Sequence, residues 1–402
     1  MARNNNNFKQ VNFSKFQMPA FLLGLAALAL CGFAYYQDPK FVIQSYFNGY
    51  MIWLCMALGC FGLTLLQHTV KARWGIPILR IFEAGGGPSA LCLMAILFLP
   101  LAFHLPLLYD WVHPKIVQQD PVLMHRSIYM NVPFFLARTA LYFGIMILIA
   151  SFLRKSTLRQ DRNHDVNEFA KRINLSAPGI VLFVLIVNFA FTDWVMSLTP
   201  HWYSSIYGFL FVVYQAILAL SFATFLVTAS ALKPPYQEIV RPGLTKDLGN
   251  MLFTLTMLWG YFTISQFLII WSGNLPELNT FYITRNESFW LYLGAALVIG
   301  QFFIPFFLLL SPRVKANPKN LMILSAFIFL MGIVTIYWNV IPMFRLTPPN
   351  WVDFAAFIGI GGLWYSVYAS RIKKAPLLPG YDTRLVEDAH SYDEEVSHAS
   401  NR

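Results

Sequence analysis

Long apolar runs recur along the whole chain, and short polar connections separate them. Ten of these runs are close to the length of about 20 residues that an α-helix needs to cross a bilayer. We expect spans at 18–36, 46–67, 88–110, 131–153, 177–198, 203–231, 248–272, 288–311, 320–342 and 351–371. Runs of this length are too long for the strands of a membrane barrel, so the pattern predicts an all-α integral membrane protein with ten transmembrane helices.

The polar ends of the chain define its domain organisation. Residues 1–17 are polar and rich in Asn, residues 18–371 form the polytopic membrane domain, and residues 372–402 form an acidic tail. No small-residue cleavage site follows the first apolar run, so we expect that run to be retained as a helix.

Composition agrees with this organisation. Of the 402 residues, 57% are hydrophobic and 12% are charged, and the mean hydropathy is +0.54, which excludes a soluble globular domain. The four cysteines all lie within apolar runs, where neither a disulfide framework nor a metal-binding pair is expected. We interpret them as packing residues.

The distribution of charge predicts the orientation. The N-terminal segment, alternate connections and the C-terminal tail together carry 23 of the 29 Lys and Arg residues, and the remaining connections carry five. By the positive-inside rule both termini are cytoplasmic. The net charge of +10 therefore reflects membrane topology, and we expect no nucleic-acid partner.

One junction between two spans carries an unusual group of residues. Residues 191–208 read FTDWVMSLTPHWYSSIYG, in which Trp, Tyr, His and Pro crowd a short connection. Aromatic rings of this kind gather where helices meet the headgroup layer. The aromatic belt does not explain Asp193, because an acid inside an apolar helix is costly unless it has a partner or a function.

The run DWVMSLTPHWYSSIYG resembles the signature of the ActF family, integral membrane components of bacterial alternative complex III, a quinol:cytochrome c (or copper protein) oxidoreductase. This family belongs to the wider NrfD/polysulfide-reductase membrane family. The resemblance implies two four-helix bundles, formed by helices 2–5 and 6–9 and flanked by helices 1 and 10. It also implies a non-catalytic subunit of respiratory or photosynthetic electron transport in the bacterial cytoplasmic membrane.

The resemblance further implies partners and cofactors. The expected partners are a multihaem cytochrome, an iron–sulfur subunit and a sister membrane subunit that binds the quinol, so haem c and iron–sulfur clusters belong to other chains. The sister subunit typically has a Gly-Trp-His run where this chain has His201, Trp202 and Tyr203. That departure argues against quinone binding by this subunit.

The residues themselves indicate no redox centre in this chain. A transmembrane b-type haem needs paired axial ligands, and only His104 lies well inside a predicted span. The chain has no CxxCH motif and no cysteine set for an iron–sulfur cluster.

Three ionisable residues lie at a common predicted depth. His104, Arg138 and Asp193 belong to the third, fourth and fifth spans, and each lies about 8–11 Å below the outer edge at 1.5 Å per residue. One interpretation is a salt bridge between Arg138 and Asp193 that fixes helix packing, with His104 hydrogen-bonded nearby. The other is a proton relay or a remnant quinone-headgroup site. The two are compatible.

Four further residues are candidates for a proton path. His201 and Tyr203 lie at the outer junction, Asp110 ends the third predicted span, and Asp247 lies near the cytoplasmic mouth of the second half. A secondary transporter is the alternative function, although transporters tend to have broken helices at corresponding positions in related halves. A membrane-embedded enzyme lacks support, because the chain shows no nucleophile–base pair or metal cluster.

The charge asymmetry leads to a direct test of topology. In a cysteine-free background, Ser204→Cys should react with an impermeant thiol reagent from outside intact cells, whereas Ser391→Cys should react only after lysis. The reverse labelling pattern would contradict the predicted orientation.

Overall fold

The computed structural model describes residues 11–163, 165, 167–286, 288–379 and 382. Within these residues every regular element is a helix, and ten helical stretches are long and apolar enough to cross a membrane. The chain is therefore an all-α, multi-span membrane protein, as the apolar pattern predicts.

Six spans are single helices: α1 (Gln17–Tyr35), α2 (Pro39–Val70), α8 (Val132–Asn163), α10 (Tyr207–Ala229), α11 (Pro242–Gly273) and α17 (Trp351–Ile372). Two end in a short 3-10 helix: α9 (Asn167–Trp194) with η4 (Met196–Leu198), and α16 (Pro318–Val340) with η7 (Ile341–Met343). The third span comprises η1 (Arg73–Gly75), α3 (Ile76–Gly85), α4 (Pro88–Leu97) and α5 (Leu99–Phe103). The eighth comprises α13 (Ser288–Leu297), the π-helical η6 (Val298–Phe303) and α14 (Ile304–Leu310). Short helices in the connections are η2 (Leu105–Leu107), η3 (Asp110–Val112), α6 (Pro114–Gln119), α7 (Pro121–Arg126), η5 (Tyr236–Glu238), α12 (Pro276–Ile283) and α15 (Pro312–Ala316).

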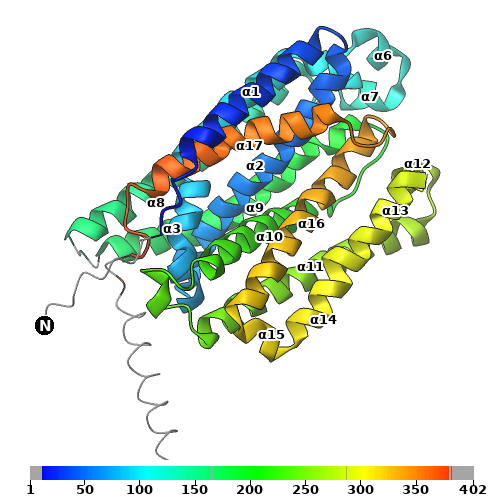
Figure 1. Cartoon of the computed structure of the whole chain (residues 1–402). Coiled ribbons are helices and arrows are strands. Elements are labelled where there is room, and N and C mark those ends of the chain that lie inside the picture. Colours follow the sequence, from blue (N-terminus) through cyan, green and yellow to red (C-terminus); the bar gives the residue numbers. More distant parts are fainter. Residues whose placement is uncertain (1–10, 164, 166, 287, 380–381, 383–402) are drawn as a thin grey trace, which may run out of the picture.

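The spans form two four-helix bundles. The first contains α2, the third span, α8 and α9, and the second contains α10, α11, the eighth span and α16. Helices α2 and α10 pack against each other and join the two bundles, while α1 lies along α17 and both cover α2 (Figure 1). This is the arrangement that the family resemblance implies.

Several helices begin at a proline with a polar cap before it. Asp38 accepts a hydrogen bond from the Phe41 N–H at 3.0 Å in front of Pro39, and Asn317 caps α16 in the same way. Proline suits the first helical turn because its missing N–H would have no partner there, and the cap satisfies one of the remaining donors. These signals define where α2 and α16 begin.

The third span differs from its prediction. It runs over Arg73–Phe103 instead of 88–110, and all ten residues of α3 are buried. Hydropathy places its start too late because Arg80 and Glu83 lower the apolar content of the segment before Gly85. The break between α3 and α4 falls at Gly86 and Gly87, so this helix is discontinuous within its span.

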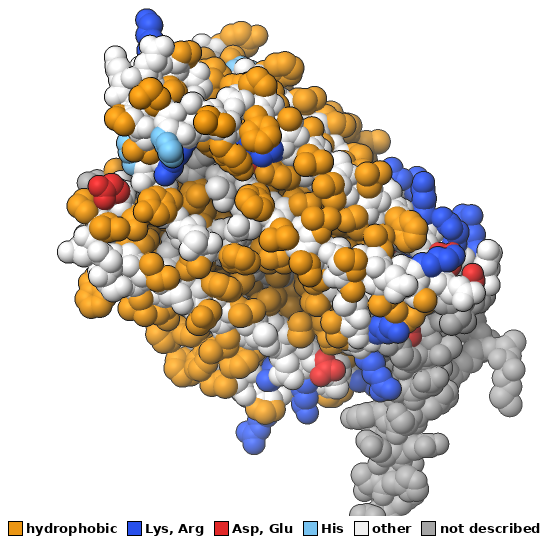
Figure 2. All heavy atoms as spheres, turned by 180° about the vertical axis from the view of Figure 1, so that it is seen from behind, with side chains coloured by type: hydrophobic (Ala, Val, Ile, Leu, Met, Phe, Trp, Pro, Cys, Tyr) orange, Lys and Arg blue, Asp and Glu red, His pale blue; other side chains and the backbone are white. Residues whose placement is uncertain are grey.

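The surface matches a bilayer. Hydrophobic side chains cover a broad area of the face in view, and Lys and Arg side chains gather mainly toward one end of it (Figure 2). Many large apolar residues are exposed, as expected for side chains that face lipid tails.

Close packing of α2 against α10 depends on a glycine. A Cβ at Gly59 would lie only 2.0 Å from the carbonyl oxygen of Gln215, whereas a Cβ at Gly144 on α8 would meet nothing within 4 Å. We predict that Gly59→Ala destabilises the fold by about 1–3 kcal/mol through overpacking. Gly144→Ala is the matched control and should be neutral or stabilising, by up to about 1 kcal/mol. Thermal unfolding in detergent measures both, and equal midpoints for the two variants would contradict the close approach.

Candidate functional site

A buried ion pair joins α8 to α9 within the first bundle. Arg138 donates from Nε to Asp193 Oδ2 at 2.8 Å and from Nη2 to Oδ1 at 3.1 Å, and Tyr142 donates to Oδ2 at 2.9 Å. The Asp193 side chain is 0% exposed. Paired charge and three hydrogen bonds offset the cost of removing this carboxylate from water. The predicted salt bridge is confirmed.

Arg138 is held on its other side by an aromatic clamp. Its Nη1 donates to the backbone carbonyl of Tyr129 at 2.9 Å, and its guanidinium carbon lies 3.8 Å from the Tyr129 ring centroid and 4.3 Å from that of Phe134. Cation–π contact stabilises a desolvated guanidinium. We call Arg138, Asp193, Tyr142 and Tyr129 the outer cluster, after the side of the membrane on which the sequence predicts Arg138 and Asp193.

A vestibule adjoins the outer cluster. This hollow of about 400 Å³ is lined in part by Tyr129, Ser197, Trp202 and Tyr203. Ser197 donates to the Asp193 backbone carbonyl at 2.5 Å, and Tyr203 is exposed. Trp202 and Tyr203 of the aromatic junction therefore line a hollow that is also lined by Tyr129 of the outer cluster.

His104 does not join the outer cluster, and this part of the prediction is wrong. The third span ends at Phe103, so His104 lies just beyond it instead of six residues inside. Its ring nitrogens contact the Tyr35 hydroxyl at 2.9 Å and the Pro100 carbonyl at 2.7 Å. The side chain therefore faces the first helix.

The structure does not bring His201, Asp110 and Asp247 together with the outer cluster. His201 Nε2 lies 2.8 Å from Asp120 Oδ2 in the connections outside the spans. Burial alone would raise the pKa of Asp120, but the N–H groups of the next helical turn and the neighbouring His201 lower it. Asp110 and Asp247 are exposed and do not join the outer cluster.

A second set of buried ions lies at the opposite end of the first bundle. Glu83 Oε2 accepts from Arg80 at 2.6 Å and from Arg154 at 2.5 Å, and Arg80 also donates to Asp161 at 2.5 Å. His68 Nε2 lies 3.9 Å from Glu83 Oε1. We call His68, Arg80, Glu83, Arg154 and Asp161 the inner cluster.

Further polar side chains extend this end of the bundle. The buried Arg172 donates to Ser156 at 3.1 Å and also to Gln160, and Ser156 donates to Glu168 at 2.7 Å. Glu168 pairs with Lys171 at 2.9 Å, and the Lys171 side chain is exposed. A chain of hydrogen bonds therefore runs from buried Arg172 to exposed Lys171.

A small cavity lies at the break in the third span. It has a volume of about 10 Å³, and Thr64, Glu83, Gly87 and Arg154 are among its lining residues. That is room for about one water molecule. Glu83 Oε1 and His68 Nε2 have no hydrogen-bond partner among the described residues, and at 3.9 Å these two atoms are too far apart to bond each other directly.

The inner cluster is not predicted from the sequence, because hydropathy assigns its residues to cytoplasmic connections. Helix α8 extends ten residues beyond the predicted end of the fourth span at 153, and α9 begins at Asn167 instead of 177. A signal was present in α3, where Arg80 and Glu83 are three residues apart in an otherwise apolar run.

The two clusters are separated by an apolar stretch. Arg138 and Arg154 are sixteen residues apart on α8, which is about 24 Å along a helix. Met146 and Ala150 lie between them on the buried face of α8. The first bundle therefore holds ions toward both ends and apolar packing in its middle.

Among the described residues, no group of three His, Cys, Asp or Glu side chains is placed to hold a metal ion. No known protein family matches the chain, and no curated protein does so either.

The outer ion pair generates a stability prediction. Asp193→Ala leaves Arg138 buried without its partner, so we expect a loss of about 3–5 kcal/mol. The double variant Arg138→Met with Asp193→Leu removes both charges and should recover most of this loss. Unfolding of the purified variants in detergent provides the measurement, and a double variant no more stable than Asp193→Ala would contradict the pairing argument.

Proposed function

We propose that this chain is the cofactor-free membrane subunit of a quinol:electron-acceptor oxidoreductase of the alternative complex III type. It would lie in the bacterial cytoplasmic membrane with both termini inside, and would itself be non-catalytic, structural and proton-translocating. The junction signature at 191–208 supports the family, and the charge asymmetry supports the orientation. The ten-span, two-bundle architecture agrees with both.

The observation that carries proton translocation is the pair of ion clusters in one bundle. Buried ionisable groups in a membrane are expensive and commonly mark ion or proton pathways. The pair of Arg138 and Asp193 would by itself fulfil a purely structural role. Such a role does not explain why a second cluster lies at the other end of the same four helices. Two half-paths that meet at an apolar centre account for both.

The chemistry of each half-path follows from its carboxylate. Asp193 lies between a cation and the Tyr142 hydroxyl, and that hydroxyl both donates and accepts, so it is able to pass a proton. Glu83 adjoins the water-sized cavity and His68, and histidine is the side chain whose ordinary pKa lies nearest neutrality.

Electron transfer would take place elsewhere in the complex. The proposed partners are the multihaem cytochrome, the iron–sulfur subunit and the sister quinol-binding membrane subunit. Under this proposal the present chain supplies the membrane frame and a proton route, and it takes its driving force from conformational changes in those partners.

One observation favours the alternative of a secondary transporter. The third span is broken at Gly86 and Gly87, and discontinuous helices are typical of transporter binding sites. The second bundle has a π-helix in its third helix, whereas the break in the first bundle is in its second helix. The interruptions therefore do not correspond in order, and we prefer the first proposal.

Proton translocation is tested in the purified complex reconstituted in liposomes. Asp193→Asn and Glu83→Gln keep the side-chain size and one acceptor oxygen for the neighbouring arginine but remove the titrating carboxylate. Quinol oxidation should continue in both variants, while protons translocated per electron should fall substantially. Asp353→Asn is the matched control, because Asp353 is also buried and paired, to Arg345 at 2.5 Å, but lies outside the first bundle.

Two outcomes would contradict these proposals in different ways. Parent-like proton-to-electron ratios in both assembled variants would show that the clusters are structural. Isolation of the native chain alone, without haem- or iron-containing partners, would contradict membership of the complex and favour the transporter.

A further inference from the structure

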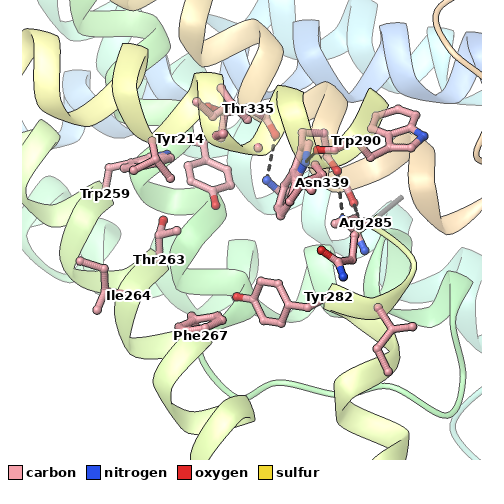
Figure 3. A pocket seen from close by; sticks show the side chains of 18 residues that line it. Tyr214, Trp259, Thr263, Ile264, Phe267, Tyr282, Arg285, Trp290, Thr335 and Asn339 are labelled. Carbon is pink, nitrogen blue, oxygen red and sulfur yellow. Dashed lines mark hydrogen bonds between the residues drawn. The ribbon is translucent and has the colours of Figure 1, made fainter. Parts of the chain in front are cut away.

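A pocket in the second bundle lies apart from both ion clusters. Its volume is about 550 Å³, and it lies between α10, α11, α13 and α16, with the end of α12 beside it (Figure 3). A cavity of this size suits a small molecule or part of a lipid. None of its lining residues belongs to the outer or inner cluster.

Hydrogen-bond donors converge in this pocket. The hydroxyl groups of Tyr214, Thr263 and Tyr282 point into the same space, and they come from three different helices (Figure 3). The indole N–H of Trp259 is buried without a hydrogen-bond partner among the described residues, whereas the Thr263 hydroxyl interacts with that of Tyr214. An unsatisfied buried donor is costly, and a ligand with acceptor atoms would complete it.

One wall of the pocket carries a buried positive charge. Arg285 is 3% exposed and donates to the carbonyls of Phe281 at 2.7 Å, Asn339 at 2.8 Å and Trp338 at 3.2 Å. No carboxylate among the described residues lies within 4.0 Å of it. Burial lowers the pKa of Arg285 to about 10, so the group still carries its charge at neutral pH. The guanidinium has five N–H groups, and two of them remain for a ligand.

The mouth of the pocket is apolar and faces the bilayer. Ile264, Phe267, Leu291 and Val298 line it and are all exposed on the lipid-facing surface. Arg285 lies in the connection between α12 and the eighth span and donates to carbonyls near the end of α16. The site therefore has a polar, cationic end and an apolar end.

We propose that this pocket binds an anionic glycerophospholipid of the surrounding bilayer. Its phosphate oxygens accept hydrogen bonds from Arg285 and the converging hydroxyls, and one acyl chain lies along Ile264, Phe267 and Val298. A phosphate is acceptor-only and negatively charged, which matches a described lining that offers donors and a cation but no acid. A neutral headgroup would satisfy the hydroxyls but would leave the charge of Arg285 without a counter-ion. The proposal does not depend on the function proposed above.

Native mass spectrometry of the full-length protein in detergent tests the site. Delipidated protein is titrated with phosphatidylglycerol, with diacylglycerol of the same acyl chains, and with inorganic phosphate. We expect phosphatidylglycerol to bind at least about ten-fold more tightly than diacylglycerol, because charge-assisted hydrogen bonds are lost with the phosphate. Inorganic phosphate, which lacks the acyl chains, should not bind measurably.

Variants assign the binding to this pocket. Arg285→Gln should abolish the preference for phosphatidylglycerol, and the double variant Thr263→Val with Tyr282→Phe should weaken binding without removing the charge. The double variant keeps the test valid if Arg285→Gln does not fold. Tyr261→Phe is the matched control, because Tyr261 is on α11 and 66% exposed but does not line the pocket.

Equal affinity for phosphatidylglycerol and diacylglycerol would overturn the proposal. Parent-like binding by the double variant and by folded Arg285→Gln would do so too, as would binding of inorganic phosphate alone. Displacement of bound phosphatidylglycerol by a short-chain neutral quinone at equal concentration would also overturn it, since the pocket would then prefer an uncharged head.

Discussion

The structure depends on the cost of placing charge in a medium that does not solvate it. Arg138 and Asp193 are tolerated between α8 and α9 because each satisfies the other and because Tyr142, Tyr129 and Phe134 surround the pair. The same requirement links His68 on α2, Glu83 on α3 and Arg154 on α8 at the other end of the bundle. The positions of α2, α8 and α9, and the break in the third span, are therefore coupled to these charges.

The broken third span connects the chain's chemistry to its architecture. At Gly86 and Gly87, where this span is broken, any Cβ would lie within 2.3 Å of backbone atoms of α2 or of Glu83. The two glycines let the chain change direction while α3 stays buried. Arg80 and Glu83 are thereby buried near one end of the bundle, although they come from a segment whose composition resembles a loop.

Much of the fold could be predicted from the sequence, since the length and spacing of apolar runs report directly on a bilayer. The pairing of Arg138 with Asp193 followed from equal depth and opposite charge. A predicted depth does not say which way a side chain points around its helix axis, and it does not fix the residue at which the helix ends. The prediction for His104 was wrong on both counts. The inner cluster remained hidden because charged residues lower the local hydropathy even when they are buried in pairs. The phospholipid pocket brings together residues from distant spans, and no local pattern in the sequence marks that meeting.

The apolar stretch around Met146 and Ala150 has an electrical consequence. If water reaches the ion clusters at both ends of the first bundle, the low-dielectric layer is shortened and the membrane potential falls mainly across the segment between them. A charge that crosses the whole potential exchanges about 2.3 kcal/mol per 100 mV with the field. Most of that work would be concentrated over a few side chains, which makes this segment the insulator of the bundle. The thickness of this segment, more than the identity of either cluster, would determine how well the protein resists ion leakage driven by the membrane potential.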